Sequence, residues 1–143
     1  MSEATNISGE KSQLLDRQDD LELWLLGTET IPEFNAFVLK VYNQAFTNGT
    51  YRIPEEDIAG PSREFFHKAR VCGVRHKTGQ LIGTWGLILK EVTDTAFRLP
   101  LELRYNLPVE KIIRDLDSPH TRYAFNGWRT AVDKDALEKF SID

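Results

Sequence analysis

Cysteine is nearly missing from this sequence: Cys72 is the only one among 143 residues, so no disulfide can form within the chain. A protein without disulfides is typical of a reducing compartment, and we expect it to be cytoplasmic. Val71 and Val74 lie close to Cys72 in a segment typical of a β-strand. A reactive thiol needs a neighbour that lowers its pKa, so a buried, inert thiol is favoured over a nucleophile.

Long apolar runs are also missing. No stretch approaches the roughly 18 apolar residues that a membrane-spanning helix requires. Residues 1–20 lack the basic start and the following apolar stretch of a signal peptide. We therefore expect a soluble protein in which the polar residues 1–20 form a flexible N-terminal arm, followed by a single domain over residues 21–143.

An excess of positive charge is absent as well, because the formal net charge is −4. Dedicated nucleic-acid-binding proteins usually carry a basic patch, so this class is not expected. The sequence holds one basic cluster, Arg70, Arg75, His76 and Lys77. We interpret it as the solvated end of a hairpin. The three histidines show no metal-ligand spacing to one another or to the cysteine, so no metal site is predicted.

The residues that are present, 41% of them apolar, predict an α+β chain with a mixed sheet and a packed core. A short apolar run predicts a first strand over residues 21–26. The clearest helix follows, because apolar residues recur there at three- and four-residue steps. Thr30 and Glu33 have the spacing of a capping box at its start, and Asn48-Gly49 favours a left-handed stop at its end.

Two further helical segments are expected. Residues 62–68 predict one or two turns, with Phe65 and Phe66 pointing inward, inside a long segment that is punctuated by proline and glycine. A short helix is expected directly after Pro108, since proline is tolerated where a helix begins.

Three strands complete the predicted sheet. Residues 69–76 and 81–91 form a hairpin around a turn over residues 77–80. Both faces of the 81–91 strand are mostly apolar, which predicts a central strand that is covered on both sides. Residues 123–132 form the last strand, and Asp133 is a good N-cap for a final helix.

Short motifs in these segments resemble one family. Residues 81–87 (LIGTWGL) resemble the central strand of acyl-homoserine lactone synthases and long-chain N-acyl amino acid synthases. Residues 99–102 (LPLE) are similar to the "LP-x-E" segment of the second group, and residues 125–133 (FNGWRTAVD) resemble its "E-x-x-R-x-a-V-d" strand. Over residues 21–135 the chain therefore resembles the N-terminal portion of the GNAT-like acyl-CoA N-acyltransferase fold.

The departures from the family pattern concern its functional positions. Gly86 stands where the family has an arginine, Asn126 stands where it has a glutamate, and Arg129 keeps the family identity. Residues 134–143 contain no glycine, whereas the family has a glycine-rich turn that binds the cofactor's pyrophosphate at a helix start. The chain ends roughly 50 residues short of the usual fold. We expect a truncated fragment, half of a split protein, or a domain that has lost acyl-CoA binding.

The resemblance suggests roles for two charged residues. Arg129 would hold a substrate carboxylate, but a structural arginine in a salt bridge is an equally good interpretation, since an unpaired buried charge is very costly. Glu102 is a weak candidate for proton transfer. Glu102 and Arg104 would share one side of an extended segment, where they could form a site pair, but a surface ion pair between them is favoured.

Three more residues are candidates for substrate binding. Asn126 cannot act as a base, because a carboxamide does not titrate near neutral pH, but it can orient a substrate by hydrogen bonds. Trp85 and Trp128 both lie on predicted strands and would face a common groove, although packing in the core is the favoured interpretation.

Two functions follow as expectations, and a third interpretation stays open. In the first, an N-acyltransferase uses acyl-CoA or an acyl-carrier protein as co-substrate and acts on an amine such as an amino acid, while backbone donors near bulged strands stabilise the oxyanion. In the second, a degenerate, non-catalytic acyltransferase-like module binds a partner protein or a small ligand. A homodimer joined through the last strand, or a complementing chain, would cover its exposed sheet edge. An unrelated α+β fold remains the third possibility.

Overall fold

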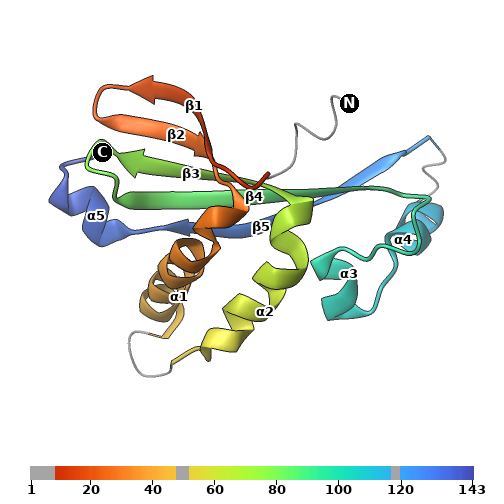
Figure 1. Cartoon of the computed structure of the whole chain (residues 1–143). Coiled ribbons are helices and arrows are strands. Elements are labelled where there is room, and N and C mark those ends of the chain that lie inside the picture. The colour runs from red at the N-terminus through yellow and green to blue at the C-terminus, as the bar shows by residue number, and fades with distance from the viewer. Residues whose placement is uncertain (1–8, 48–51, 117–119) are drawn as a thin grey trace. The chain divides into compact units, whose positions relative to one another are not determined.

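The computed structural model describes residues 9–47, 52–116 and 120–143 (Figure 1). The chain divides into two compact units. Unit 1 consists of Met1–Gly86 and Arg129–Asp143, and unit 2 consists of Leu87–Trp128. The expectation of one domain over residues 21–143 stays a prediction.

The predicted α+β class is confirmed, but the expectation of a mixed sheet is wrong: the five strands form an antiparallel sheet in the order β1-β2-β3-β4-β5. Its strands are β1 (Gln13–Gln18), β2 (Leu21–Leu25), β3 (Ala69–His76), β4 (Leu81–Glu91) and β5 (Tyr123–Val132). The hairpin and the last strand have the predicted bounds, because runs of strand-forming residues and a glycine turn are local signals. Gly79 occupies that turn with a φ of 95°, a conformation that favours glycine.

Strand β1 corrects the interpretation of residues 1–20 as an arm. Residues Gln13–Gln18 pair with β2 in antiparallel register, which shifts between Leu14 and Asp16. All six residues of β1 are exposed, so backbone hydrogen bonds to β2 rather than a buried face hold the strand in place. A strand of this kind lacks the alternation that predicts strands from sequence. Residues 1–8 of the expected arm lie outside the described residues.

Helix α1 (Ile31–Thr47) confirms the predicted long helix, although its start differs from the expectation. A short 3₁₀ turn, η2 (Thr28–Thr30), precedes it. The hydroxyl of Thr30 donates to the carbonyl of Gly27 at 2.7 Å, and Glu33 binds Arg75 of β3 instead of closing a capping box. The expected stop at Asn48-Gly49 lies outside the described residues.

Helix α2 (Glu55–Phe65) is longer than predicted and is followed by the 3₁₀ turn η3 (Phe66–Lys68). The helix begins seven residues before the predicted one, and Pro61 lies inside it. Three acidic residues in its first turn favour this start, because they interact well with the positive end of the helix dipole. Phe65 and Phe66 are buried, as predicted.

The core of unit 1 is apolar and lies where α1, α2 and β3 meet. Phe34 and Phe66 are fully buried and meet edge to face, with ring centroids 5.1 Å apart and an interplanar angle of 78°. Other fully buried side chains are Leu26, Val38 and Val71. Aromatic pairs prefer this geometry, which adds to the stabilisation from apolar burial.

The basic hairpin end, expected to be solvated, is partly buried. Arg75 forms two bonds of 2.7 Å with the carboxylate of Glu33. The ring of His76 is buried and stacks on Phe140, which follows helix α5 (Lys134–Lys139), at a centroid distance of 3.8 Å. Lys77 remains exposed and pairs with Asp20. These contacts anchor the hairpin to α1 and to the C-terminal segment within unit 1.

Unit 2 contains the end of β4, helix α3 (Pro100–Tyr105), helix α4 (Val109–Asp115) and the beginning of β5. The short helix expected after Pro108 is confirmed by α4. The expectation of an extended segment around Glu102 is wrong, because Glu102 lies in α3. Pro100 at its first position and Glu102 at its third are typical of a helix start.

Strand β4 is central, as predicted, because it lies between β3 and β5, but it is covered on both sides only in its first half, Leu81–Thr84. Ile88 and Lys90 are buried, whereas Trp85 is 47% exposed and Leu89 is 53% exposed. In a strand, residues two apart share a face, so one face of β4 carries exposed apolar side chains. The apolar residues on both faces of β4 therefore do not show that both faces are buried along the whole strand.

Candidate functional site

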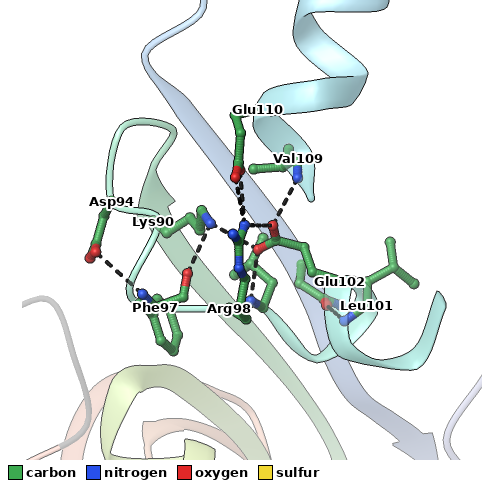
Figure 2. Close-up of polar contacts among 10 residues, drawn as sticks. Lys90, Asp94, Phe97, Arg98, Leu101, Glu102, Val109 and Glu110 are labelled. Carbon is green, nitrogen blue, oxygen red and sulfur yellow. Dashed lines mark hydrogen bonds and ion pairs between the residues drawn. The ribbon is translucent and has the colours of Figure 1, made fainter. Parts of the chain in front are cut away.

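The most densely connected polar group in unit 2 surrounds the carboxylate of Glu102 (Figure 2). Lys90 Nζ lies 2.9 Å from Glu102 Oε1, and Arg98 Nη1 lies 3.1 Å from Glu102 Oε2. The backbone N–H groups of Leu99 and Val109 donate to the same carboxylate at 2.9 and 2.8 Å. Glu102 thus accepts four hydrogen bonds, from one donor in β4, two donors in the segment just before α3 and one donor at the start of α4.

A second carboxylate extends this cluster. Arg98 Nη1 lies 2.9 Å from each carboxylate oxygen of Glu110, in the first turn of α4. Lys90 Nζ also donates to the carbonyl of Phe97 at 2.9 Å. We call Lys90, Arg98, Glu102 and Glu110 the ion cluster. Its formal charge is zero, and it connects α3 and α4 to β4 within unit 2.

The surroundings of Glu102 determine its protonation. Burial by itself raises the pKa of this carboxyl, but the two backbone N–H groups, Lys90 and Arg98 outweigh it and lower the pKa to about 2. A general base works best with a pKa near the operating pH and with a lone pair that can reach a substrate proton. Glu102 combines a low pKa with a fully engaged carboxylate, which argues against the suggested proton transfer.

The favoured alternative for Glu102 was a surface ion pair with Arg104, and this expectation is wrong. Glu102 is buried and binds Lys90 and Arg98. Residues two apart on a helix do not face each other, so the helical state of α3 separates the two side chains.

Asn126 supports the same helix. Its Oδ1 accepts a hydrogen bond of 2.8 Å from the backbone N–H of Leu101, in the first turn of α3. The first N–H groups of a helix have no partner within the helix, so this contact satisfies one of them. The amide oxygen suggested for substrate orientation thus stabilises the start of α3.

Arg129 lies at an irregular point of β5 within unit 1. Its φ of 56° is in the left-handed region, which is uncommon for a residue with a side chain. Its Nη2 donates to the carbonyls of Asp57 and Ile58 in α2 at 3.3 and 3.4 Å. Burial lowers the pKa of Arg129, with Tyr42 opposing this effect. Arg129 therefore connects β5 to α2, and its suggested role as a binder of a substrate carboxylate stays a prediction.

The two tryptophans differ in exposure. Trp128 is buried, which agrees with packing in the core, whereas Trp85 is about half exposed. They belong to different units, so the common groove stays a prediction. Cys72 is buried, and this burial raises the pKa of its thiol, as expected of an inert cysteine.

Comparisons of the chain with protein-family models, curated proteins and solved structures give no match. In the described ranges, no group of three or more histidine, cysteine, aspartate or glutamate side chains is placed to hold a metal ion. The same ranges contain no helix that is both long and apolar enough to cross a membrane.

Sequence reasoning singled out Glu102 but missed Lys90, Arg98 and Glu110. One signal was present: Lys90 interrupts the apolar face of β4 that carries Ile82 and Ile88. A lysine on the buried face of a strand requires a buried carboxylate, because an unpaired buried charge is very costly. Its partner is twelve residues away in a helix that was not predicted, so spacing alone did not identify the pair.

Proposed function

We propose that this chain is a non-catalytic, acyltransferase-like binding module that associates with a second copy of itself through the free edge of β5. The supporting observation is that two suggested site residues, Glu102 and Asn126, have their acceptor oxygens engaged in holding α3. Meanwhile β5 is the last strand of the described sheet. An exposed strand edge presents unpaired backbone donors and acceptors, which another strand can pair.

The register of β5 identifies the groups that point outward. The N–H of Val92, just after β4, donates to the carbonyl of Arg122 at 2.8 Å. In an antiparallel pair, residues alternate between bonding the neighbour and pointing away from it. The backbone groups of Tyr123, Phe125 and Gly127 therefore point away from β4 and form what we call the free edge, in which the Gly127 carbonyl already accepts a hydrogen bond from the side-chain amide of Asn126.

The side chains of the free edge suit pairing with an identical strand. Phe125 is 69% exposed and Tyr123 is 49% exposed, and the segment contains neither proline nor lysine. With a two-fold axis at Phe125, the phenylalanines of the two copies lie opposite each other. Tyr123 of each copy then lies opposite Gly127 of the other. Cross-strand aromatic pairs, and aromatic residues opposite glycine, stabilise such pairing.

The free edge ends where β5 becomes irregular. Beyond Arg129, the hydroxyl of Tyr42 in α1 donates to the carbonyl of Thr130 at 3.2 Å. This contact occupies an acceptor on β5 within unit 1. The proposed interface therefore covers the first half of β5, and antiparallel pairing of two identical edges gives a closed dimer rather than a filament.

The oligomeric state tests this proposal. Sedimentation velocity of the full chain is expected to show a monomer–dimer equilibrium. Phe125→Lys should shift it toward monomer through charge repulsion across the axis, and Gly127→Pro should do the same by removing an outward N–H. A Cβ added at Gly127 would meet no atom within 4 Å, so a side chain has room at this position. Leu103→Lys, at an exposed leucine of α3, is the matched control and should retain the dimer. A monomeric wild type, or a Phe125→Lys dimer, would refute the proposal.

The N-acyltransferase is a second candidate, favoured by the left-handed backbone at Arg129. Residues in sparsely populated backbone conformations cluster at active sites, where they orient backbone groups. The candidate requires acyl-CoA or an acyl-carrier protein to bind the folded chain. Acyl-CoA should then raise the melting temperature by mass action, and the absence of a shift at saturating concentrations would count against an enzyme.

A further inference from the structure

An asparagine followed by a glycine, Asn126-Gly127, lies in β5 within unit 2. Asparagine is a chemically labile residue, because the next backbone nitrogen can attack its side-chain carbonyl carbon. Glycine in the second position favours this attack, since it has no side chain to block the approach. Gly127 is exposed, and a Cβ added to it would meet none of the described atoms within 4 Å.

The carboxamide of Asn126 is held beside the residue that carries the nucleophile. Its Nδ2 donates a hydrogen bond to the carbonyl of Gly127. This contact limits the rotation of the carboxamide and keeps it against the Gly127 peptide group. Holding two reacting groups together removes much of the entropic cost of bringing them into contact.

A backbone donor contacts the oxygen that would gain charge in the attack. Asn126 Oδ1 accepts a hydrogen bond of 2.8 Å from the N–H of Leu101, in α3. When a nitrogen bonds to Cγ, this oxygen becomes an oxyanion, and a donor already fixed beside it stabilises the developing charge. The contact that supports α3 therefore also activates the carboxamide.

The nucleophilic nitrogen is not engaged by β4. In the register fixed by the bond between Val92 and Arg122, the N–H of Gly127 points away from β4. Loss of its proton to solvent therefore breaks no hydrogen bond between β4 and β5.

From these contacts we infer that Asn126 is a site of deamidation that the fold itself promotes. The Gly127 nitrogen gives its proton to solvent and bonds to Asn126 Cγ. The Cγ–Nδ2 bond breaks, and Nδ2 takes up a proton and leaves as ammonia. The five-membered ring then adds one water molecule. Opening of one ring C–N bond gives aspartate, and opening of the other gives isoaspartate.

The two products differ in their effect on β5. Aspartate keeps an oxygen for the N–H of Leu101, so the start of α3 retains its contact. Isoaspartate carries the main chain through the side-chain carbon, and the extra methylene interrupts the two-residue alternation of the strand. The conversion is expected in the monomer, so the inference does not rest on the proposed dimer.

Incubation of the full chain in mildly alkaline buffer, at a dilution where sedimentation velocity shows the monomer, tests the inference. Peptide mapping by mass spectrometry should show conversion of Asn126 to aspartate and isoaspartate. Gly127→Ala, which has room for its methyl group, should slow the conversion roughly tenfold, equivalent to about 1.4 kcal/mol in activation free energy. Asn106, exposed and followed by Leu107, is the internal control and should stay unchanged. The map separates Asn126 from Asn48-Gly49, the other Asn-Gly pair of the sequence.

The same measurement in urea separates the effect of the fold from that of the sequence. The folded chain should convert Asn126 at least as fast as the unfolded chain, because unfolding removes the contacts of the carboxamide with Leu101 and Gly127. Slower conversion in the folded chain, or none, would overturn the inference, since β5 would then protect the residue. Equal rates for the wild type and Gly127→Ala would overturn it as well.

Discussion

Unit 1 and unit 2 stabilise their interiors by different means. In unit 1, Phe34 and Phe66 meet edge to face among other fully buried apolar side chains. In unit 2, the ion cluster holds the helices, and the side chain of Lys90 is 0% exposed. Apolar burial is non-directional and scales with area, whereas a buried ion pair stabilises only if every partner is present. We therefore expect unit 1 to tolerate conservative changes that unit 2 does not.

The largest effect is expected for Glu102→Gln. The substitution preserves shape but leaves the charge of buried Lys90 without a carboxylate, and breaking a buried pair costs about 3–5 kcal/mol. Urea unfolding monitored by circular dichroism would measure the loss in the free energy of unfolding. Glu91→Gln, at an exposed position of β4, is the control. A loss as small as that of the control would contradict a structural role for the ion cluster. Lys90→Met combined with Glu102→Leu should recover most of the loss, because a well-packed apolar pair often replaces a buried ion pair.

Acid should weaken the same cluster. The pKa of Glu102 is about 2 in the folded protein and 4.5 in its ordinary state. Because the folded-state pKa is the lower one, this contribution to the free energy of unfolding, about 3 kcal/mol, is complete above about pH 5 and is lost as the pH falls toward 2. Urea unfolding at a series of pH values should show this loss in the wild type. The free energy of unfolding of the Glu102→Gln variant should not show this loss. An identical pH profile in both proteins would exclude the contribution of Glu102.

A smaller effect is expected for Phe66→Leu in unit 1. The leucine remains apolar and fills much of the same space, so the free energy of unfolding should fall by only about 1–2 kcal/mol, including the loss of the aromatic pair with Phe34. Thermal and urea unfolding would measure it. A loss equal to that of Glu102→Gln would remove the proposed difference between the units.

The smallest effect is expected for Asp133→Asn, the counterpart of Glu102→Gln in unit 1. Asp133 is buried, caps α5 through the N–H groups of Asp135 and Ala136, and pairs with Lys40. Asparagine retains the capping oxygen, and Lys40, with a side chain 51% exposed, can be hydrated once its partner is neutral. We expect a loss of about 1 kcal/mol or less in urea unfolding. A loss of several kcal/mol would show that buried carboxylates are equally sensitive in both units.

Local signals account for the parts of the fold that were predicted. The bounds of β3, β4 and β5 match the prediction because each strand is a run of strand-forming residues, and a turn over residues 77–80 separates the first two. Strand β1 was missed because its register depends on β2 rather than on its own pattern. Helix α2 was recognised only in part because Gly60 and Pro61 obscured its periodicity.

The candidate site was predicted less well than the fold. Glu102 was identified from a motif, but its role depends on Lys90 and Arg98, whose positions follow from the paths of β4 and the segment before α3. Asn126 was considered as a substrate ligand, whereas its position on β5 places it against the start of α3. Both outcomes depend on which side chains meet across the sheet and its helices, which spacing along the chain does not specify.

By itself, the sequence determined the class of the fold, the hairpin, the last strand, the long first helix and the absence of disulfides within the chain. Each of these follows from residue type and local periodicity. Only the tertiary structure decided that Glu102 is a buried ion-pair partner, that Arg129 adopts a left-handed conformation against α2, and that one face of β4 carries exposed apolar side chains. The physical reason is that burial and pairing depend on distant segments, so one residue type can be a surface charge or a structural centre.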